Sequence, residues 1–131
     1  MTNKPDLLLS IVVPVYNEAE NIAALHAEIL QVCRGTGGPF EIIIVDDGST
    51  DGTPEVVKGL APVTSISLRR NFGQTAAMDC GIKHAWGEYI VTMDGDGQND
   101  PADIPALLAH LKACDLDAVS GWRRKRRDSP R

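Results

Sequence analysis

The acidic, glycine-rich segment Asp94-Gly95-Asp96-Gly97-Gln98-Asn99-Asp100 has the residue types and spacing best suited to chemistry. Asp94 and Asp96 are separated only by a glycine, so both carboxylates and a closely approaching ligand can share one small volume. Mg²⁺ or Mn²⁺ held by one or two carboxylates usually completes its shell with phosphate oxygens and water. The pair therefore predicts a metal site that holds a diphosphate and offsets the charge growing on a leaving group.

A solvated turn and a calcium loop are the alternatives to a metal and diphosphate site in this segment. Asp and Gly are common in solvated turns, but this pair directly follows a hydrophobic stretch and accompanies two other acidic loops in the same kind of position. A calcium loop fits less well, because Asn99 replaces the turn glycine and Pro105 stands where the bidentate glutamate belongs. The segment starting at Asp47 fails the same comparison, since Lys58 takes the final ligand position.

Hydrophobic segments alternating with helical patterns must position these loops. Strands are predicted at 7–15, 41–45, 63–68, 89–93 and 118–120, and helices after Asn17, near 54–59, at 73–85 and from Pro101. Asn17 is expected to cap the first helix, Thr50 or Asp51 the second, and Pro101 to lie in the first turn of the last. The alternation predicts an α/β fold, a doubly wound and mainly parallel sheet with helices on both faces.

Ligands of such sheets bind beyond the carboxyl ends of the strands, where loops 16–18, 46–51 and 94–100 should converge. Asp46 and Asp47 are both candidates for nucleotide binding, since either could accept hydrogen bonds from a base edge or a ribose hydroxyl, and we expect one of the two, foremost Asp47, to bind ligand and the other to be structural. Arg70 ends the third strand, where it could meet a phosphate or form a surface ion pair. The sequence has neither GxxxxGK[ST] nor an early GxGxxG, so the phosphates must be held through metal.

Composition indicates one ordinary globular domain. The net charge is −5, but residues 1–121 alone carry 7 basic and 17 acidic groups, which disfavours nucleic acid as a partner. The apolar stretch 7–15 is too short to span a bilayer, and no secretory signal precedes it, so a cytoplasmic location is expected. Cys33, Cys80 and Cys114 form no CxxC pair and are expected to be reduced and structural, and none of the three scattered histidines is expected to be catalytic.

Four motifs in order resemble the family 2 glycosyltransferases of GT-A fold, and within them the polyprenyl-phosphate (dolichol-phosphate-like) sugar transferases. The motifs are Val13-Pro14-Val15-Tyr16-Asn17-Glu18, Val45-Asp46-Asp47-Gly48-Ser49-Thr50-Asp51, Arg70-Asn71-Phe72-Gly73-Gln74 and Met93-Asp94-Gly95-Asp96-Gly97-Gln98. The resemblance implies nucleotide binding by Pro14, Tyr16, Glu18 and Asp47, and metal and diphosphate binding by Asp94, Asp96 and Gln98. It also implies a Rossmann-like GT-A sheet.

The resemblance further implies an inverting transferase that moves a sugar from a UDP- or GDP-linked donor to an acceptor, with Mg²⁺ or Mn²⁺ as cofactor. Residues 1–121 would form the nucleotide-sugar-binding domain, and 122–131 a basic tail leading to an acceptor-side region. The chain is accordingly expected to be the N-terminal part of a longer, membrane-associated enzyme of cell-envelope glycosylation. The alternatives are a non-catalytic nucleotide-sugar-binding module and, with less support, a sugar nucleotidyltransferase, which would want a Gly-rich, Arg-containing loop where Pro14 to Glu18 stand.

The chemistry of such a transfer leaves the general base unassigned. A hydroxyl acceptor needs a base within hydrogen-bond reach, and no residue can be given that role from the sequence. A polyprenyl phosphate is already an anion at neutral pH and needs none, so positioning and charge neutralisation could suffice. The basic tail would suit that acceptor or an anionic membrane surface, with a solvated chain end as the alternative.

Overall fold

The structure, a computed structural model, describes residues 7–93, 100–114 and 118–119 of the chain. Strands and helices alternate along it as the sequence predicts. The elements are β1 (Leu9–Val15), α1 (Ile22–Arg34), β2 (Phe40–Asp46), α2 (Thr53–Lys58), β3 (Thr64–Ser67), α3 (Gln74–His84), β4 (Tyr89–Thr92), the 3₁₀ helix η1 (Pro101–Asp103), α4 (Ile104–Cys114) and β5 (Ala118–Val119).

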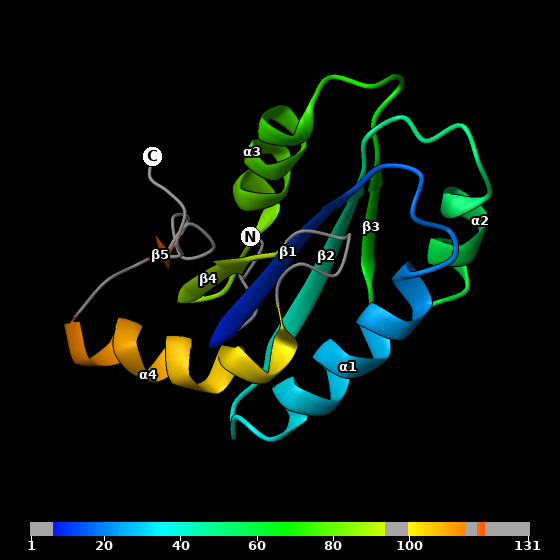
Figure 1. The fold of residues 1–131 in the computed structure, drawn as a ribbon. Helices are drawn as coiled ribbons and strands as arrows, with labels where there is room; N and C mark the ends of the chain where they lie inside the picture. Colours follow the sequence, from blue (N-terminus) through cyan, green and yellow to red (C-terminus); the bar gives the residue numbers. More distant parts are fainter. Residues whose placement is uncertain (1–6, 94–99, 115–117, 120–131) are drawn as a thin grey trace, which may run out of the picture.

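The strands form one parallel sheet in the order β3-β2-β1-β4-β5 (Figure 1). The order reverses at β1, which lies between β2 and β4, so the sheet is doubly wound and the predicted fold class is confirmed. Each pair of neighbouring parallel strands needs a crossover, and the helices supply the crossovers. The carboxyl ends of β1, β2, β3 and β4 therefore share one edge of the sheet, here called the carboxyl edge.

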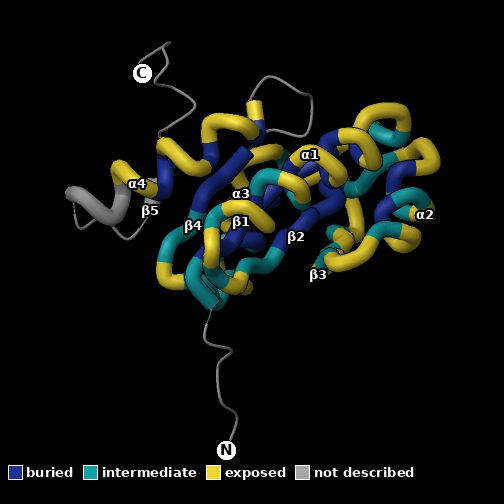
Figure 2. Tube along the Cα trace, turned by 90° about the horizontal axis from the view of Figure 1, so that it is seen from below, coloured by how far each residue is buried: buried dark blue, intermediate teal, exposed yellow. Residues whose placement is uncertain are grey.

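Helices cover both faces of the sheet. One face of β1, with Leu9, Ile11 and Val13, packs in a core that also includes side chains of α1, α2 and α4. Val12 points to the other face and packs with Ala77 of α3. Figure 2 shows the consequence, with the central strands buried and the outer turns of the helices exposed. Burial on both faces explains why β1 and β2 are nearly continuous apolar runs rather than alternating ones.

The close packing of α3 depends on Gly81. A Cβ built at Gly81 would lie 2.4 Å from Cγ1 of Val12 and 3.1 Å from Cγ2 of Val45. These contacts leave no room for a side chain, so the glycine lets the helix backbone approach the sheet. That approach fixes where the N-terminus of α3 reaches the carboxyl edge.

The predicted helix caps need correction. Asn17 does not cap α1, because the N-cap is Asn21 and Asn17 has a positive φ of 55° four residues earlier. The N-cap of α2 is Gly52 rather than Thr50 or Asp51, although the Asp51 carboxylate accepts a hydrogen bond from the first helical N–H at 2.9 Å. Pro101 does begin a helix, but its first turn is 3₁₀. Residue type alone suggests that these residues cap helices. It does not show that the Asn17 side chain binds a neighbouring loop instead.

The described cysteines are free thiols, as expected. Cys33 of α1 is fully buried in the core, and this burial raises its pKa to about 11. Cys80 on α3 is half-buried. No helix in the described part of the chain is both long and apolar enough to cross a membrane.

We expect iodoacetamide at pH 8 to modify Cys80 in the native chain much faster than Cys33. A thiol whose pKa is raised by two units has about one hundredth of the thiolate of an ordinary one, and burial blocks access as well. Mass spectrometry of the peptides containing each cysteine measures the two rates. In denaturant the difference should vanish, and equal rates in the native protein would contradict the packing of Cys33.

Candidate functional site

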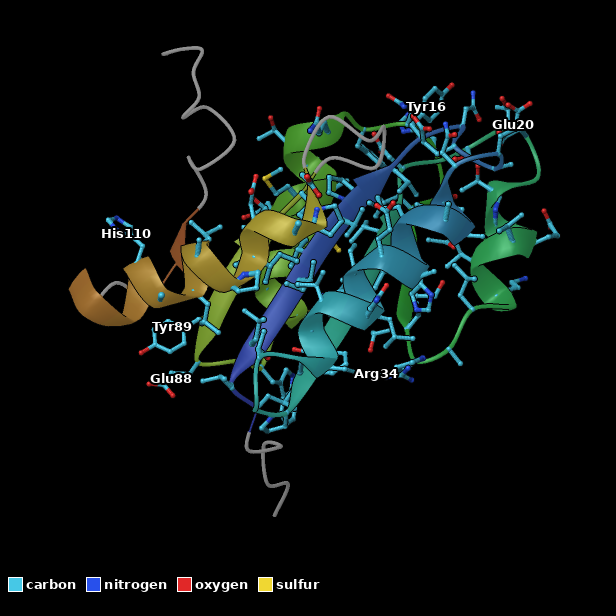
Figure 3. The ribbon with its side chains drawn as sticks, turned by 60° about the horizontal axis from the view of Figure 1, so that its bottom comes forward. Tyr16, Glu20, Arg34, Glu88, Tyr89 and His110 are labelled. Atoms are coloured by element: carbon cyan, nitrogen blue, oxygen red, sulfur yellow. The ribbon has the colours of Figure 1, made fainter. Side chains whose placement is uncertain are left out.

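The first two predicted loops begin side by side at the carboxyl edge. Val15 is in register with Asp46 in the sheet, and the Asp47 N–H donates to the Val15 carbonyl at 2.8 Å. Figure 3 places Tyr16 and Glu20 at this end of the molecule and Glu88 and Tyr89 at the opposite end. The topology therefore brings together 16–20 and 46–51, which are 26 or more residues apart in sequence.

The motif Pro14-Val15-Tyr16-Asn17-Glu18 changes from buried to exposed within a few residues. Pro14 is buried in β1, whereas the Tyr16 side chain is 43% exposed at the carboxyl edge. Glu18 is half-buried, and its Oε1 accepts a hydrogen bond from Nδ2 of Asn21 at 2.9 Å. The exposed ring of Tyr16 could stack on a base, and the Glu18 carboxylate two residues later could accept from a base edge or a ribose hydroxyl.

Asp46 and Asp47 are equally buried, each 3% exposed, but they bind different segments. The Asp46 carboxylate accepts from the N–H of Ser49 at 3.3 Å and from its hydroxyl. The Asp47 carboxylate reaches across the edge and accepts from the N–H groups of Phe72 at 2.8 Å and Gly73 at 3.0 Å. Both aspartates thus have structural roles, and the expected contact between Asp47 and a ligand stays a prediction.

The Asp47 bonds tie the segment 70–73 to β2. Gly48 has a φ of +73°, and its backbone lies against the backbone of Arg70 and Asn71. A Cβ built at Gly48 would be 2.2 Å from the carbonyl carbon of Arg70 and 2.4 Å from the nitrogen of Asn71. Arg70 is exposed, and its guanidinium lies over the Phe72 ring, 4.8 Å from the centroid. Among the described residues the structure gives Arg70 no carboxylate partner.

Two loops of the carboxyl edge are joined by a reciprocal set of hydrogen bonds that we call the loop clamp. Residues 17–19 donate their N–H groups to side chains of 49–53, and Oδ1 of Asn17 accepts from N–H groups of Thr50 at 2.8 Å and Asp51 at 3.2 Å. Hydrogen bonds to Asp51, foremost from the Thr53 hydroxyl, lower the pKa of its carboxyl. The roles of Asn17, Ser49 and Thr53 in the clamp could not be predicted from the sequence, because each bonds across the clamp to a residue more than 30 positions away.

The proposed metal ligands Asp94, Asp96 and Gln98 lie outside the described residues. The chain enters that segment from Met93, which is buried and donates its N–H to the Val12 carbonyl at 2.9 Å. It leaves at Asp100, whose carboxylate accepts from the Ala102 N–H and caps η1. In the part that the structure describes, no three His, Cys, Asp or Glu side chains gather to hold a metal ion.

The histidines do not gather at the carboxyl edge. His26 is buried in α1, with Nε2 3.2 Å from the Pro62 carbonyl, and Nδ1 of His84 lies 2.8 Å from the Cys80 carbonyl. His110 lies on α4, away from Tyr16 (Figure 3). The described histidines thus supply no general base at this edge.

Comparison with known proteins decides the family of this chain. The model of the family described as glycosyl transferase family 2 matches residues 10–131. The chain belongs to glycosyl transferase family 2. The family domain thus extends over the sheet and the three predicted loops, and the resemblance inferred from the four motifs is confirmed.

Curated relatives include two polyprenyl-phosphate sugar transferases. The dodecaprenyl-phosphate galacturonate synthase of Rhizobium johnstonii is 44% identical over 135 residues, which cover 97% of this chain and 40% of the relative. The undecaprenyl-phosphate 4-deoxy-4-formamido-L-arabinose transferase of Pectobacterium carotovorum is 40% identical over 126 residues, 92% of this chain and 38% of the relative. The chain therefore spans about two fifths of the length of these relatives.

Solved structures of glycosyltransferases share the fold. A mannosyltransferase from Pyrobaculum calidifontis, solved with GDP-Man and Mn²⁺, is 31% identical with a TM-score of 0.57, over 70% of this chain and 28% of that one. Glucosyl-3-phosphoglycerate synthase from Mycobacterium tuberculosis has a TM-score of 0.66 at 24% identity, over 82% of this chain and 40% of that one, and supports the fold alone. The GT-A-like architecture expected from the motifs is thereby confirmed.

Proposed function

We propose that this chain is the donor-binding part of an inverting glycosyltransferase that moves a sugar from a nucleotide diphosphate to a polyprenyl phosphate. The observation that carries the proposal is the convergence of Tyr16, Asp47 and Arg70, from three different loops, at the carboxyl edge of a parallel sheet. The relatives from Rhizobium and Pectobacterium, which are named for polyprenyl-phosphate products or acceptors, support the choice of acceptor. Such an acceptor would bring the whole protein to a membrane surface, for which we propose the cytoplasmic face.

The nucleotide would lie against the loops that follow β1 and β2. Pro14, Tyr16 and Glu18 would contact the base and ribose, with Asp47 accepting hydrogen bonds through lone pairs that Phe72 and Gly73 leave free. Asp46 would support this loop from behind through Ser49. Titration with each nucleotide distinguishes uracil from guanine as the preferred base.

The phosphates would lie between Arg70 and the segment that follows β4. The exposed guanidinium of Arg70 suits a phosphate because it can donate two parallel hydrogen bonds. Asp94, Asp96 and Gln98 supply two carboxylates and an amide oxygen, a donor set that fits Mg²⁺ or Mn²⁺. A bound ion would offset the negative charge on the departing nucleoside diphosphate.

The transfer itself would be a direct displacement at the anomeric carbon. An oxygen of the acceptor phosphate forms the new bond to that carbon as the bond to the donor β-phosphate oxygen breaks, and the electron pair leaves with the nucleoside diphosphate. The acceptor is already an anion, so no proton needs to be removed. The protein would contribute position and charge neutralisation.

Calorimetry of this chain with UDP and with GDP, each with and without Mn²⁺, tests the donor site. We expect one nucleotide to bind only with metal, and Asp96→Ala to weaken that binding at least about tenfold, or about 1.4 kcal/mol. Asp103→Ala removes an exposed aspartate of η1 and serves as the matched control with unchanged affinity. A folded chain that binds neither nucleotide would contradict the proposed donor site.

A further inference from the structure

The segment that carries Tyr16 and Glu18 is held by its backbone. Three successive N–H groups donate to side-chain oxygens of 49–53: that of Asn17 to Ser49 Oγ at 2.8 Å, that of Glu18 to Thr53 Oγ1 at 2.9 Å, and that of Ala19 to Asp51 Oδ2 at 3.4 Å. Three consecutive donors satisfied by another loop fix both the position and the orientation of the chain between them.

Asn17 makes the loop clamp reciprocal. Its Oδ1 accepts from the N–H groups of Thr50 and Asp51, and its own N–H binds Ser49, whose hydroxyl donates to the buried Asp46 carboxylate. One residue therefore joins the first loop directly to 49–51, and through Ser49 to Asp46. Its φ of 55° lies in the left-handed region, which asparagine tolerates better than most residues and glycine adopts freely.

The loop clamp joins backbone N–H groups to side-chain oxygens of Asn17, Ser49, Asp51 and Thr53, and it does not use the side chain of Tyr16. The ring is 43% exposed, and Tyr16 lies between the end of β1 and Asn17, so β1 and the loop clamp hold the backbone on both sides of it. Without the Oδ1 acceptor, the N–H groups of Thr50 and Asp51 would turn to water and the two loops would separate more easily. The ring would then spend less time in one orientation, and binding would pay the entropy of ordering it.

We propose that Asn17 is a positioning residue for nucleotide binding, which acts by holding Tyr16 through the loop clamp. This inference rests on the proposed donor site. Asn17 itself would make no contact with the nucleotide. Ser49, Asp51 and Thr53 would support the same position as members of the loop clamp.

Asn17→Gly and Asn17→Asp separate the acceptor from the backbone conformation. Glycine keeps the left-handed φ but removes Oδ1, and we expect it to raise the Kd of the nucleotide in Mn²⁺ about tenfold. Aspartate keeps an acceptor oxygen in the same place, and we expect it to restore the Kd to within about threefold of the original. Calorimetry gives the Kd values and thermal unfolding gives Tm.

Thr36→Ala is the control for a general loss of stability. It removes one side-chain hydrogen bond, from the Thr36 hydroxyl to the Cys33 carbonyl at 2.8 Å, just beyond the C-terminus of α1. It should lower Tm slightly and leave the Kd unchanged. If Asn17 acted only through stability, Thr36→Ala and Asn17→Gly variants of equal Tm would bind equally.

A double-mutant cycle tests the route through Tyr16. In a Tyr16→Ala background the added Asn17→Gly change should alter the Kd less than about twofold, because there is no ring left to position. Independent, multiplying effects would overturn the role assigned to Asn17, as would an unchanged Kd in Asn17→Gly alone. No nucleotide binding by the unmodified chain would instead overturn the donor site, and the inference with it.

Discussion

Replacement of Gly48 by alanine should lower the free energy of unfolding by about 3 kcal/mol, with a corresponding fall in Tm. Two costs add at this position. The backbone is left-handed, at φ +73°, and the new Cβ would lie 2.2 Å from the Arg70 carbonyl carbon and 2.4 Å from the Asn71 nitrogen. Both of these atoms belong to the backbone, so they cannot move aside as the end of a flexible side chain could. The segments 46–51 and 70–73 must therefore separate to make room for the new Cβ.

Gly37→Ala is the matched control for Gly48→Ala. Gly37 also has a positive φ, of 86°, but a Cβ there would meet nothing within 4 Å. Gly37→Ala should therefore cost only the free energy of placing alanine in a left-handed backbone, about 1 kcal/mol. Denaturant unfolding of both variants measures the difference, and equal losses would mean that the two segments do not touch as described.

Asp47→Ala should cost about 2–3 kcal/mol of stability, because two hydrogen bonds from backbone N–H groups to a carboxylate are lost while the burial of a charge is relieved. Those bonds, at 2.8 Å and 3.0 Å, hold Phe72 and Gly73 just before α3 begins. The loss of stability should be larger around Phe72 and Gly73 than in the rest of the protein. Amide hydrogen exchange at Phe72 and Gly73 should accelerate more than exchange in the central strands.

Asp100→Ala provides the comparison for Asp47→Ala. The exposed Asp100 carboxylate accepts one backbone N–H, that of Ala102, as an N-cap, so its removal should cost about 1 kcal/mol. If Asp47→Ala were no more costly than Asp100→Ala, the Asp47 carboxylate would not be the tie between β2 and α3. Nucleotide titration of the same Asp47 variant also tests its expected ligand contact.

The spacing of apolar residues along the sequence was enough to predict the sheet and its helices. The runs at 7–15 and 41–45 are apolar on both faces because both faces of β1 and β2 are covered, and that pattern is visible in the residue types alone. The alternation of these runs with helical patterns restricts the topology, since right-handed crossovers leave few parallel arrangements. The family could be inferred from four short motifs in order, each of which lies at or just beyond the carboxyl end of a strand.

The roles of single polar residues were harder to predict. Asn17 has the residue type of a helix cap and stands shortly before an apolar helical pattern, yet its side chain binds Thr50 and Asp51. Asp46 and Asp47 are adjacent and equally buried, but they hold different segments. The hydrogen-bond partners of these residues depend on which strands are adjacent in the sheet. Distance along the sequence does not reveal which strands are adjacent.

The residue pattern was sufficient to predict the elements, the fold class and the family, since apolar spacing and strand-end motifs are local properties of the chain. The three-dimensional arrangement was needed to see that Asn17 joins two loops, that Asp47 binds the start of α3, and that Gly48 lies against the backbone of Arg70. These relations arise when parallel strands bring distant loops to one edge, where backbone groups that leave regular structure must find partners in other loops.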